Sequence, residues 1–310
     1  MIALISHPAC ELHAMGDRHP EQPARLRAIR ERLREHQLDT LLQKHEAPLV
    51  SDAQLLAAHP AEYVEQVTRS APAEGLVALD PDTRMNPHSL EAARRAAGAA
   101  VHAVDLVLGG EHQQAFCAVR PPGHHAERTR AMGFCIFGNV AIAALHAQQA
   151  HGIERVAIVD FDVHHGNGTE DIVAGREGIL FFSTFQHPLY PDSGTGATAE
   201  NVVNTPLPAG TDGSGIRDAV TREWLPRLAA FQPQLLLVSA GFDAHRADPL
   251  AQLELENADY HWLGKTLTGV AAEHCGGRMI TALEGGYDLD ALAASVEAFL
   301  RGCRGEPWVG

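Results

Sequence analysis

Short runs of apolar residues alternate with longer amphipathic stretches along most of the chain. Apolar runs bounded by polar residues are typical of buried strands, and we expect strands at residues 2–5, 115–119, 156–159, 179–183, 235–239 and 279–283. Apolar residues at helical spacing predict helices at residues 24–36, 90–108, 139–151, 216–231, 258–274 and 289–300. Regular alternation of strand and helix predicts an α/β fold, in which a mostly parallel, multi-stranded sheet carries helices on both faces.

Nothing in this pattern marks a boundary between two domains. The chain contains no linker-like, low-complexity or repeated segment, so we expect a single domain over residues 1–310. Ser51 with Gln54 three residues later predicts a capping box that opens a helix. The His59-Pro60 pair predicts that this helix is interrupted there.

The conspicuous polar motifs each follow directly after one of the expected strands. RPPGHHAERTRAMGFC follows residue 119, DFDVHHGNG follows 159, STFQHPLYPDSGTG follows 182, SAGFDAHRADPL follows 238 and EGGYDLD follows 283. Because the carboxyl ends of parallel strands lie at one edge of a sheet, these loops are expected to meet there. Such a meeting point is where α/β proteins bind ligands, so we expect an active site at this edge.

The segment after residue 159 has the strongest chemical signal. Asp160, Asp162 and His164 alternate, which in an extended segment places all three side chains on one side. Two carboxylates and an imidazole that converge at the end of a strand are suited to bind a divalent cation. The alternative is a polar turn in which the Asp and His residues cap the next helix.

The composition fits a globular protein and narrows its partners. The chain has 310 residues, of which 45% are hydrophobic and 20% charged, enough to bury a sizeable core. Its formal charge of −15 disfavours non-specific binding to nucleic acid or to an anionic membrane and favours cationic substrates. The first ten residues, MIALISHPAC, lack the pattern of a signal peptide or a membrane span. Five scattered cysteines without a CxxC pair favour a reducing compartment, so we expect a cytoplasmic location.

Taken together and in order, RPPGHHA, GFC, DFDVHHGNGT, SAGFDAHRADPL and EGGY resemble the motifs of the zinc-dependent histone deacetylase superfamily. This group includes eukaryotic class II deacetylases, bacterial deacetylase-like amidohydrolases and acetylpolyamine amidohydrolases. The resemblance extends from HPEQPARL, which begins at residue 19, to the expected helix after Tyr287. It implies an arginase/deacetylase-like fold and a zinc-dependent amidohydrolase that removes acetyl or other short acyl groups from lysine side chains of proteins or peptides.

The resemblance also implies a ligand set for the metal. Asp162, His164 and Asp248 match the family's zinc ligands and leave a position for water and for the substrate carbonyl. A Zn²⁺ held in this way lowers the pKa of a bound water from about 15.7 toward roughly 7. The alternative for Asp248 is a capping or turn residue before Pro249. No role is assigned to Asp243, and His245 is expected to be solvated or to support the ligands from outside the set.

The catalytic residues implied by the motifs are two histidines and a tyrosine. His124 and His125 are expected to line the floor of the site, with His125 as general base and then general acid. By the same match, Asp160 orients His124, and Asn167 orients His125. Class I relatives carry Asp in place of Asn167, so His125 is expected to be less basic here, as in class II. The alternative for the histidine pair is ordinary packing in a loop.

Tyr287 follows Gly285 and Gly286, which give its loop freedom to bring the hydroxyl against the substrate carbonyl. A hydroxyl that donates to the developing oxyanion lowers the barrier by about 3 kcal/mol. Because some relatives with His at this position are poor on simple acetyl-lysine, the presence of Tyr predicts amidase activity.

Further matches concern the substrate and a second ion. The residues expected to contact substrate are Gly133 and Phe134 in GFC, Tyr190 as a second aromatic wall, Asp82 or else Asp80 at the rim, Leu255 at the position where polyamine-selective relatives carry Glu, and Arg25 beneath the acetate pocket. The ordinary alternatives are core aromatics and surface charges. Relatives also bind K⁺, which is expected here at Asp160, Asp162, His164, Ser183 and Thr184.

Two other enzymatic functions and one non-enzymatic function remain as alternatives. An acetylated polyamine or another small amide would suit the negative charge, although Leu255 and the lack of a long dimerisation insert near residues 10–25 favour acyl-lysine. An arginase-like ureohydrolase needs DxHxD, and Gly166 stands where the second carboxylate of that motif belongs. A catalytically inactive binding module does not explain a complete set of ligands, histidines and tyrosine. Neither the physiological substrate nor the oligomeric state follows from the sequence.

Overall fold

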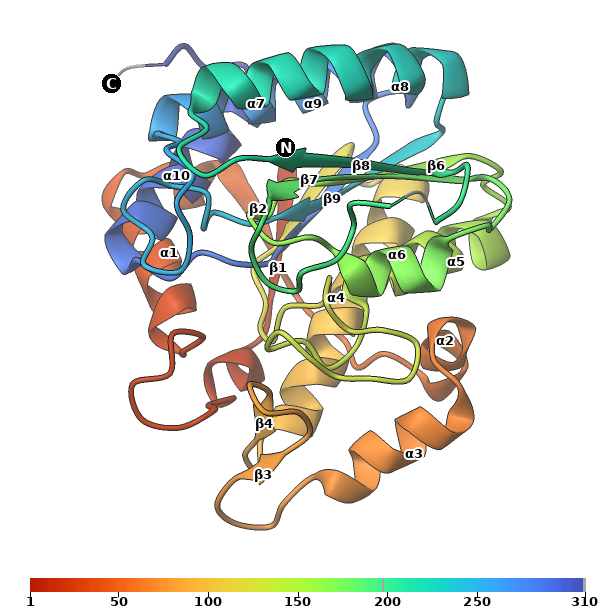
Figure 1. Cartoon of the computed structure of the whole chain (residues 1–310), viewed down its shortest axis with the longest axis vertical. Coiled ribbons are helices and arrows are strands. Elements are labelled where there is room, and N and C mark those ends of the chain that lie inside the picture. Colours follow the sequence, from red (N-terminus) through yellow and green to blue (C-terminus); the bar gives the residue numbers. More distant parts are fainter. Residues whose placement is uncertain (197, 309–310) are drawn as a thin grey trace.

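The computed structural model describes residues 1–196 and 198–308 and has an eight-stranded sheet at its centre (Figure 1). The strands lie in the order β2-β1-β5-β10-β9-β6-β7-β8, and every neighbouring pair is parallel. Their bounds are β1 Ile2–Ser6, β2 Leu42–Glu46, β5 Gln114–Cys117, β6 Val156–Asp160, β7 Ile179–Gln186, β8 Val202–Leu207, β9 Leu235–Ala240 and β10 Met279–Leu283. A small antiparallel pair, β3 Val77–Ala78 and β4 Arg84–Met85, lies apart from this sheet. The predicted α/β class with a mostly parallel sheet is confirmed.

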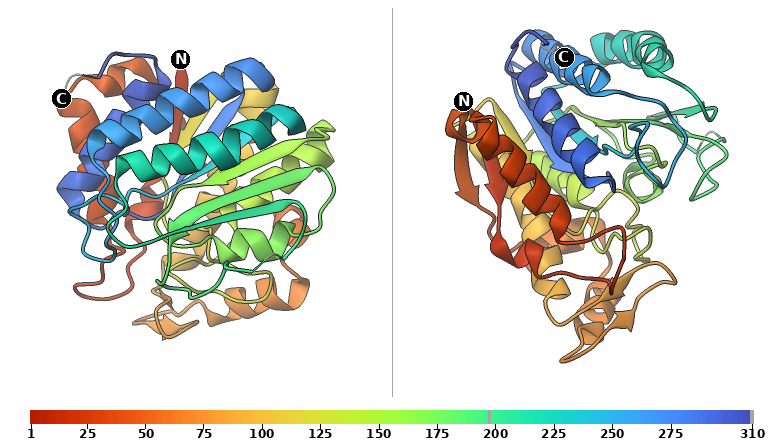
Figure 2. Two further views of the ribbon diagram at one scale, coloured as in Figure 1. Left: turned by 45° about the horizontal axis from the view of Figure 1, so that its top comes forward. Right: turned by 90° about the vertical axis from the view of Figure 1, so that its left-hand side faces the viewer.

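Helices cover both faces of the sheet, as the alternating pattern predicted. α9 Asn257–His274 packs on α10 Leu289–Cys303, which packs on α1 Ala24–Glu35, and these helices form one layer (Figure 2). α4 Ser89–Leu108 and α5 Asn139–His151 pack together on the opposite face. The remaining helical segments are η1 Pro8–Glu11, η2 Leu38–Leu41, α2 Asp52–Ala58, α3 Ala61–Ser70, α6 Asn167–Val173, α7 Gly213–Ala219, the π-helical η3 Val220–Trp224 and α8 Leu225–Phe231.

The central strands were predictable from sequence because they are buried on both faces. Every residue of β6, β9 and β10 is buried, which produces the continuous apolar runs read from the sequence. The edge strands β2 and β8 were not predicted because most of their residues are partly or fully exposed and neither strand contains a long apolar run. The predicted capping box at Ser51 and Gln54 is present, and α2 ends just before His59.

Two glycines allow α9 and α10 to lie in close contact. A Cβ atom on Gly264 of α9 would overlap the backbone oxygen of Phe299 in α10, and one on Gly302 of α10 would overlap the backbone oxygen of His261 in α9. The two positions are reciprocal across the same crossing. The absence of side chains there therefore sets the distance between the helices.

We expect Gly264→Ala and Gly302→Ala each to destabilise the protein by about 1–3 kcal/mol, because the added methyl forces two packed backbones apart. Gly269 lies in the same helix as Gly264 but has no atom near its would-be Cβ. Gly269→Ala is the matched control and should be neutral or stabilising by about 0.5–1 kcal/mol, since alanine is the better helix former. Urea unfolding monitored by circular dichroism measures all three, and equal effects at positions 264 and 269 would contradict the packing argument.

The topology brings the polar loops to one place. β5, β10, β9, β6 and β7 are consecutive neighbours at the centre of the sheet, and each predicted polar motif follows one of these strands. Because the strands are parallel, all five loops leave the same edge. Among the described residues, no helix is long and apolar enough to cross a membrane.

Candidate active site

The loops after β6 and β9 bring three possible metal ligands together. Ligand atoms of Asp162, His164 and Asp243 all lie within 4.8 Å of one another. His164 Nδ1 is 3.0 Å from Asp162 Oδ1 and 3.2 Å from Asp243 Oδ2. The strand register leads to this meeting, because β6 and β9 pair Asp160 with Ser239, and beyond the strand ends Val163 N donates to Asp243 Oδ1 at 3.0 Å, so the two loops stay side by side.

The prediction that Asp248 completes this set is wrong for this structure. One oxygen of the Asp248 carboxylate accepts a hydrogen bond from Leu250 N at 3.0 Å, and the other accepts one from Tyr287 N at 2.6 Å. Asp162 also accepts from two backbone amides, so such bonds alone do not exclude a metal ligand. What sets Asp248 apart is that it is not part of the cluster of converging ligand atoms. Asp248 also lies beyond a turn in which its own N–H donates to the His245 carbonyl oxygen. It is a turn residue, the alternative that the sequence left open, and Asp243 stands in its place beside Asp162 and His164.

The arrangement of the three side chains fits a divalent cation. Asp243 Oδ2 is buried, and its contact with His164 Nδ1 at 3.2 Å does not have hydrogen-bond geometry, so this oxygen is unsatisfied among the described residues. An unsatisfied buried carboxylate oxygen is costly unless a cation balances it. Burial and the nearby charge of Asp162 raise the pKa of Asp243 to about 7. Cβ atoms on Gly241 and Gly285 would overlap the carboxylates of Asp162 and Asp243, so the backbone leaves space for these carboxylates alone. Two carboxylates and one imidazole are a ligand set that suits Zn²⁺.

The histidine pair lies beside this cluster, and each imidazole has the partner predicted from the motifs. His124 Nδ1 is 2.9 Å from Asp160 Oδ2, and His125 Nδ1 is 2.7 Å from Asn167 Oδ1. Burial alone would lower the pKa of His124, but the charges of Asp162 and Asp160 raise it well above its usual value. Burial and the neighbouring imidazoles of His124 and His164 lower the pKa of His125, so this ring is held neutral.

Glu284, the first residue of EGGY, holds the backbone of the histidine loop. Its carboxylate is fully buried and accepts hydrogen bonds from Gly123 N at 2.7 Å and from His124 N at 3.1 Å. Ser239 Oγ donates to the other carboxylate oxygen at 3.2 Å. No role was predicted for Glu284 from the sequence. Its position directly after a fully buried strand was the available signal.

Tyr287 is held over the site by contacts on several sides. Its N–H donates to Asp248, the Arg25 guanidinium lies 5.0 Å from its ring centroid, and Phe134 meets its ring edge-on at 5.8 Å. Gly285 N donates to Asp162 Oδ2 at 2.8 Å, which ties the tyrosine loop to the metal ligands. Burial raises the pKa of the Tyr287 hydroxyl well above its usual value, so the group remains a donor at neutral pH.

Residues 19–303 match the histone deacetylase domain family. A histone deacetylase-like amidohydrolase of Pseudomonas aeruginosa is 40% identical over 278 residues, which cover 87% of this chain and 72% of that protein. Polyamine deacetylase HDAC10 of Homo sapiens is 37% identical over 323 residues, covering 98% of this chain and 46% of that protein. The crystal structure of the HDA15 HD domain matches with a TM-score of 0.92 at 34% identity, covering 98% of this chain and 89% of that one. The chain belongs to the histone deacetylase family. The predicted deacetylase-like fold is thereby confirmed.

In this member of the histone deacetylase family, Tyr190 and Gly133 lie against His125, and Phe134 follows Gly133 and contacts Tyr287. Gly133 and Phe134 both have positive φ, 55° and 68°, and a Cβ on Gly133 would overlap the His125 ring. Tyr190 lies edge-on to His125 with 5.2 Å between ring centroids. Asp82 Oδ1 accepts from Gly133 N at 3.0 Å, whereas Asp80 is paired with Arg130 at 2.8 Å. Of the two carboxylates, Asp82 is the one bonded to the Gly133–Phe134 segment, and its role at the rim stays a prediction.

Two other predicted substrate residues lie beneath the surface. Leu255 is only 1% exposed and belongs to the hydrophobic core, so the prediction that it faces the substrate is wrong. Its backbone pairs with that of His245 in an isolated parallel bridge, which turns the side chain into the protein. Arg25 is fully buried and donates to the Gly286 carbonyl oxygen at 2.7 Å and to Glu21 at 3.2 Å. It supports the Tyr287 loop from below.

The residues predicted to hold K⁺ are close together but already form internal contacts. Asp160 Oδ1 accepts from Asp162 N at 3.1 Å, and Asp162 Oδ1 accepts from His164 N at 2.9 Å, so the chain beyond β6 follows successive turns in place of an extended path. Ser183 Oγ lies 2.9 Å from His165 Nδ1. Trp224 Nε1 donates to Thr184 Oγ1 at 3.1 Å.

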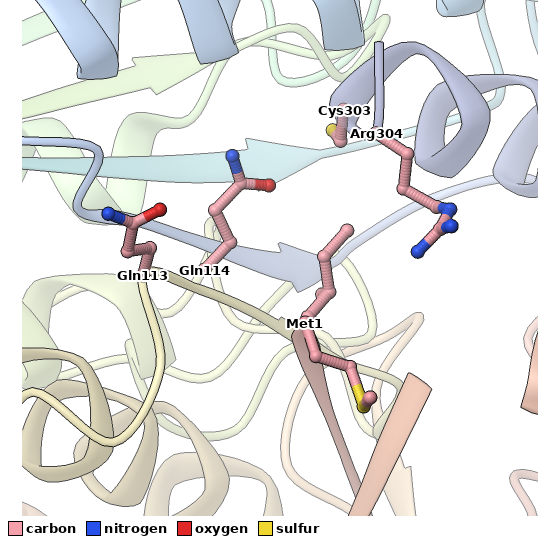
Figure 3. A pocket seen from close by; sticks show the side chains of 6 residues that line it. Met1, Gln113, Gln114, Cys303 and Arg304 are labelled. Carbon is pink, nitrogen blue, oxygen red and sulfur yellow. The ribbon is translucent and has the colours of Figure 1, made fainter. Parts of the chain in front are cut away.

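Two other features lie away from the carboxyl edge of the sheet. Asp105 of α4 meets His146 and His151 of α5 at the surface, with both Nε2 atoms 2.7 and 2.8 Å from the same carboxylate oxygen. A hollow at the opposite, amino edge of the sheet is lined by Met1, Ile2, Gln113, Gln114, Cys303 and Arg304 (Figure 3). The hollow brings no carboxylate or imidazole together, so the loop cluster remains the candidate active site.

Proposed function

We propose that the protein is a zinc-dependent deacetylase that hydrolyses the acyl amide of acetyl-lysine or a short-chain acyl-lysine in proteins or peptides. The observation that carries this proposal is the meeting of Asp162, His164 and Asp243 with the His125–Asn167 pair and with Tyr287 at one sheet edge. An arginase-like ureohydrolase is disfavoured because Gly166 still supplies no second bridging carboxylate.

Asp162, His164 and Asp243 would hold the Zn²⁺, which when bound polarises an amide carbonyl and acidifies water. His125, with Nδ1 directed at Asn167, presents Nε2 as the free acceptor. It takes the proton from the attacking water and later gives it to the leaving amine. The Tyr287 hydroxyl donates a hydrogen bond to the oxyanion that develops on the substrate. Asp160 orients the imidazole of His124, the other histidine at the floor of the site.

The substrate enters between aromatic side chains. Phe134 and Tyr190 would flank the methylene groups of an acyl-lysine, and Asp82 would accept hydrogen bonds from backbone amides at the rim. Asp82 Oδ1 already accepts from Thr83 and Gly133, and the Asp82 carboxylate also faces the Tyr190 hydroxyl, so the rim carboxylate lies directly beside an aromatic wall. Human HDAC10 is named a polyamine deacetylase, and the charge of −15 also suits a polycation. An acetylated polyamine is therefore the second candidate substrate.

We expect kcat/KM on an acetyl-lysine peptide to exceed that on acetylputrescine by about tenfold or more, because only the peptide offers backbone amides to Asp82. Both assays should be repeated after chelation and after addition of one equivalent of Zn²⁺. Loss and return of both activities together supports the zinc site. A ratio that favours acetylputrescine would assign the polyamine function, and undiminished turnover after exhaustive chelation would exclude the zinc mechanism.

Three further proposals concern the domain organisation, a second ion and the cellular compartment. The whole chain would act as a single catalytic domain. K⁺ would bind at Asp160, Asp162, His164, Ser183 and Thr184 as a structural ion, through backbone oxygens and the Ser183 hydroxyl. All five cysteines are buried as free thiols, which supports a reducing compartment such as the cytoplasm.

A further inference from the structure

The amide of Asn167 lies between the predicted general base and a second carboxylate. Its Oδ1 accepts from His125 Nδ1 at 2.7 Å, and its Nδ2 donates to Glu127 Oε1 at 2.8 Å. Met132 Sδ is a weaker second acceptor for the same Nδ2, at 3.3 Å. His125 and Asn167 are buried, and Glu127 is half-buried. The three side chains are connected by consecutive hydrogen bonds from His125 through Asn167 to the carboxylate of Glu127.

An asparagine at this position creates a problem that an aspartate would not. A carboxylate only accepts hydrogen bonds, so it always selects the imidazole tautomer with hydrogen on Nδ1. An amide presents either its oxygen or its NH₂ group, depending on its rotation. If Asn167 turned its NH₂ toward His125, then Nδ1 would become the acceptor and Nε2 would carry the hydrogen. A ring in that form cannot take a proton at Nε2.

We propose that Glu127 is a positioning residue that holds the Asn167 amide in one orientation and thereby fixes His125 with hydrogen on Nδ1. The carboxylate of Glu127 is an acceptor only, so it selects the NH₂ end of the amide and directs the oxygen to His125. This inference deepens the proposed function and rests on the role of His125 as the base. Glu127 itself does not touch the reacting atoms.

The backbone around the three residues is fixed well enough to maintain this arrangement. Thr169 N donates to the His124 carbonyl oxygen at 3.0 Å, which ties the start of α6 to the histidine loop. A Cβ on Gly168 would overlap the backbone at residues 125 and 126, so the two segments are in direct contact. Arg128 N donates to Asp171 Oδ2 at 2.8 Å, which anchors the loop one residue beyond Glu127.

The first test is the tautomer of His125 in the metal-free and the zinc-loaded protein. Long-range ¹H–¹⁵N correlation spectra of the histidine side chains distinguish hydrogen on Nδ1 from hydrogen on Nε2, and His125→Gln identifies the resonance. We expect the Nδ1–H form in the wild type and a mixture or the Nε2–H form in Glu127→Ala. Asp171→Ala removes one contact between the two segments but leaves Glu127, both amide contacts, the Thr169–His124 hydrogen bond and the close approach at Gly168. It is the control for a general loosening of the loop and should keep the wild-type tautomer. An unchanged His125 tautomer in Glu127→Ala overturns the proposal.

The second test compares the effect of Glu127→Ala on kcat in two backgrounds, in which the effect should have opposite signs. Glu127→Ala should lower kcat by about 10–100-fold with little change in KM. Glu127→Gln should lower kcat less, because its oxygen can accept the same hydrogen bond but its NH₂ group no longer enforces one orientation of Asn167. In an Asn167→Asp background the carboxylate needs no orienting partner, and Glu127 would instead face it as a like charge. Glu127→Ala should then raise kcat relative to Asn167→Asp alone. A loss of similar size in both backgrounds would show that Glu127 is merely structural.

The two tests separate this proposal from the proposed function. If the wild-type protein hydrolysed no acyl amide, the function would fail while the tautomer spectra would still test Glu127. If turnover is found and the tautomer does not depend on Glu127, only the positioning role fails.

Discussion

Asp243→Asn is expected to abolish stoichiometric zinc binding and deacetylase turnover, whereas Asp248→Asn should keep the zinc and lose part of kcat. Asp243 Oδ2 is the buried oxygen without a hydrogen-bond donor, and an amide there offers a weaker ligand with no charge. Loss of a residue that only supports a metal ligand typically costs 10–100-fold in affinity or activity, so loss of a ligand should cost more than about 100-fold. Asp248 binds only backbone amides, and its replacement displaces the Tyr287 loop.

Metal content and turnover measured on the same preparations distinguish the two carboxylates. The surface cluster of Asp105, His146 and His151 is a second place where an ion could bind, so the comparison belongs in a His146→Ala/His151→Ala background. This background should hold one zinc per chain and turn over normally. One zinc retained in Asp243→Asn, or zinc lost in Asp248→Asn, would restore the ligand set first inferred from the sequence.

The third metal ligand was predicted to be Asp248, and the structure places Asp243 there instead. The motif alone was not sufficient to choose between the two aspartates. Both aspartates lie in the same loop after β9, and residue type does not separate them. The neighbouring strands do separate them, because β6 and β9 pair Asp160 with Ser239 and beyond the strand ends Val163 N donates to Asp243 Oδ1. The missing step was therefore this contact between two loops, and it required knowing that β6 and β9 are neighbours.

Contacts between distant segments account for the other differences. The partners of His124 and His125 were predicted correctly because all four residues lie in the two characteristic motifs. Glu284 and Glu127 were not assigned because each acts through hydrogen bonds to another loop, which no local pattern reveals. Leu255 was placed at the substrate by counting from Asp248, but the pairing of its backbone with residue 245 buries it.

The fold was predicted more completely than the site because its signal is repeated along the chain. Each central strand is buried on both faces, so its apolar run is independent of which strand lies beside it. Side-chain chemistry at the edge of the sheet depends on strand order and register, which the chain does not encode locally. The site is therefore predictable in composition and loop position, and less so in the assignment of individual ligands.

Tyr287→Phe is expected to lower kcat on an acetyl-lysine peptide by about 10²–10³-fold, or roughly 2.7–4 kcal/mol of barrier, while zinc content and fold remain unchanged. The reason is that phenylalanine keeps every contact that positions the ring. The Arg25 guanidinium 5.0 Å above the ring, the edge-on Phe134 and the backbone bond to Asp248 do not involve the hydroxyl. Only the donor to the oxyanion is lost.

Tyr63→Phe is the matched control, because Tyr63 is also buried and its hydroxyl donates to a backbone oxygen, that of Ile136 at 2.6 Å, and has no assigned role toward the substrate. Its loss should lower the free energy of unfolding by about 1 kcal/mol and leave kcat within about twofold of the wild type. Because burial holds the pKa of Tyr287 above its usual value, the wild-type enzyme should also show no loss of kcat from this group as the pH rises through 9. Full turnover by Tyr287→Phe with one bound zinc would remove the hydroxyl from the mechanism and leave oxyanion stabilisation to the metal and the remaining donors.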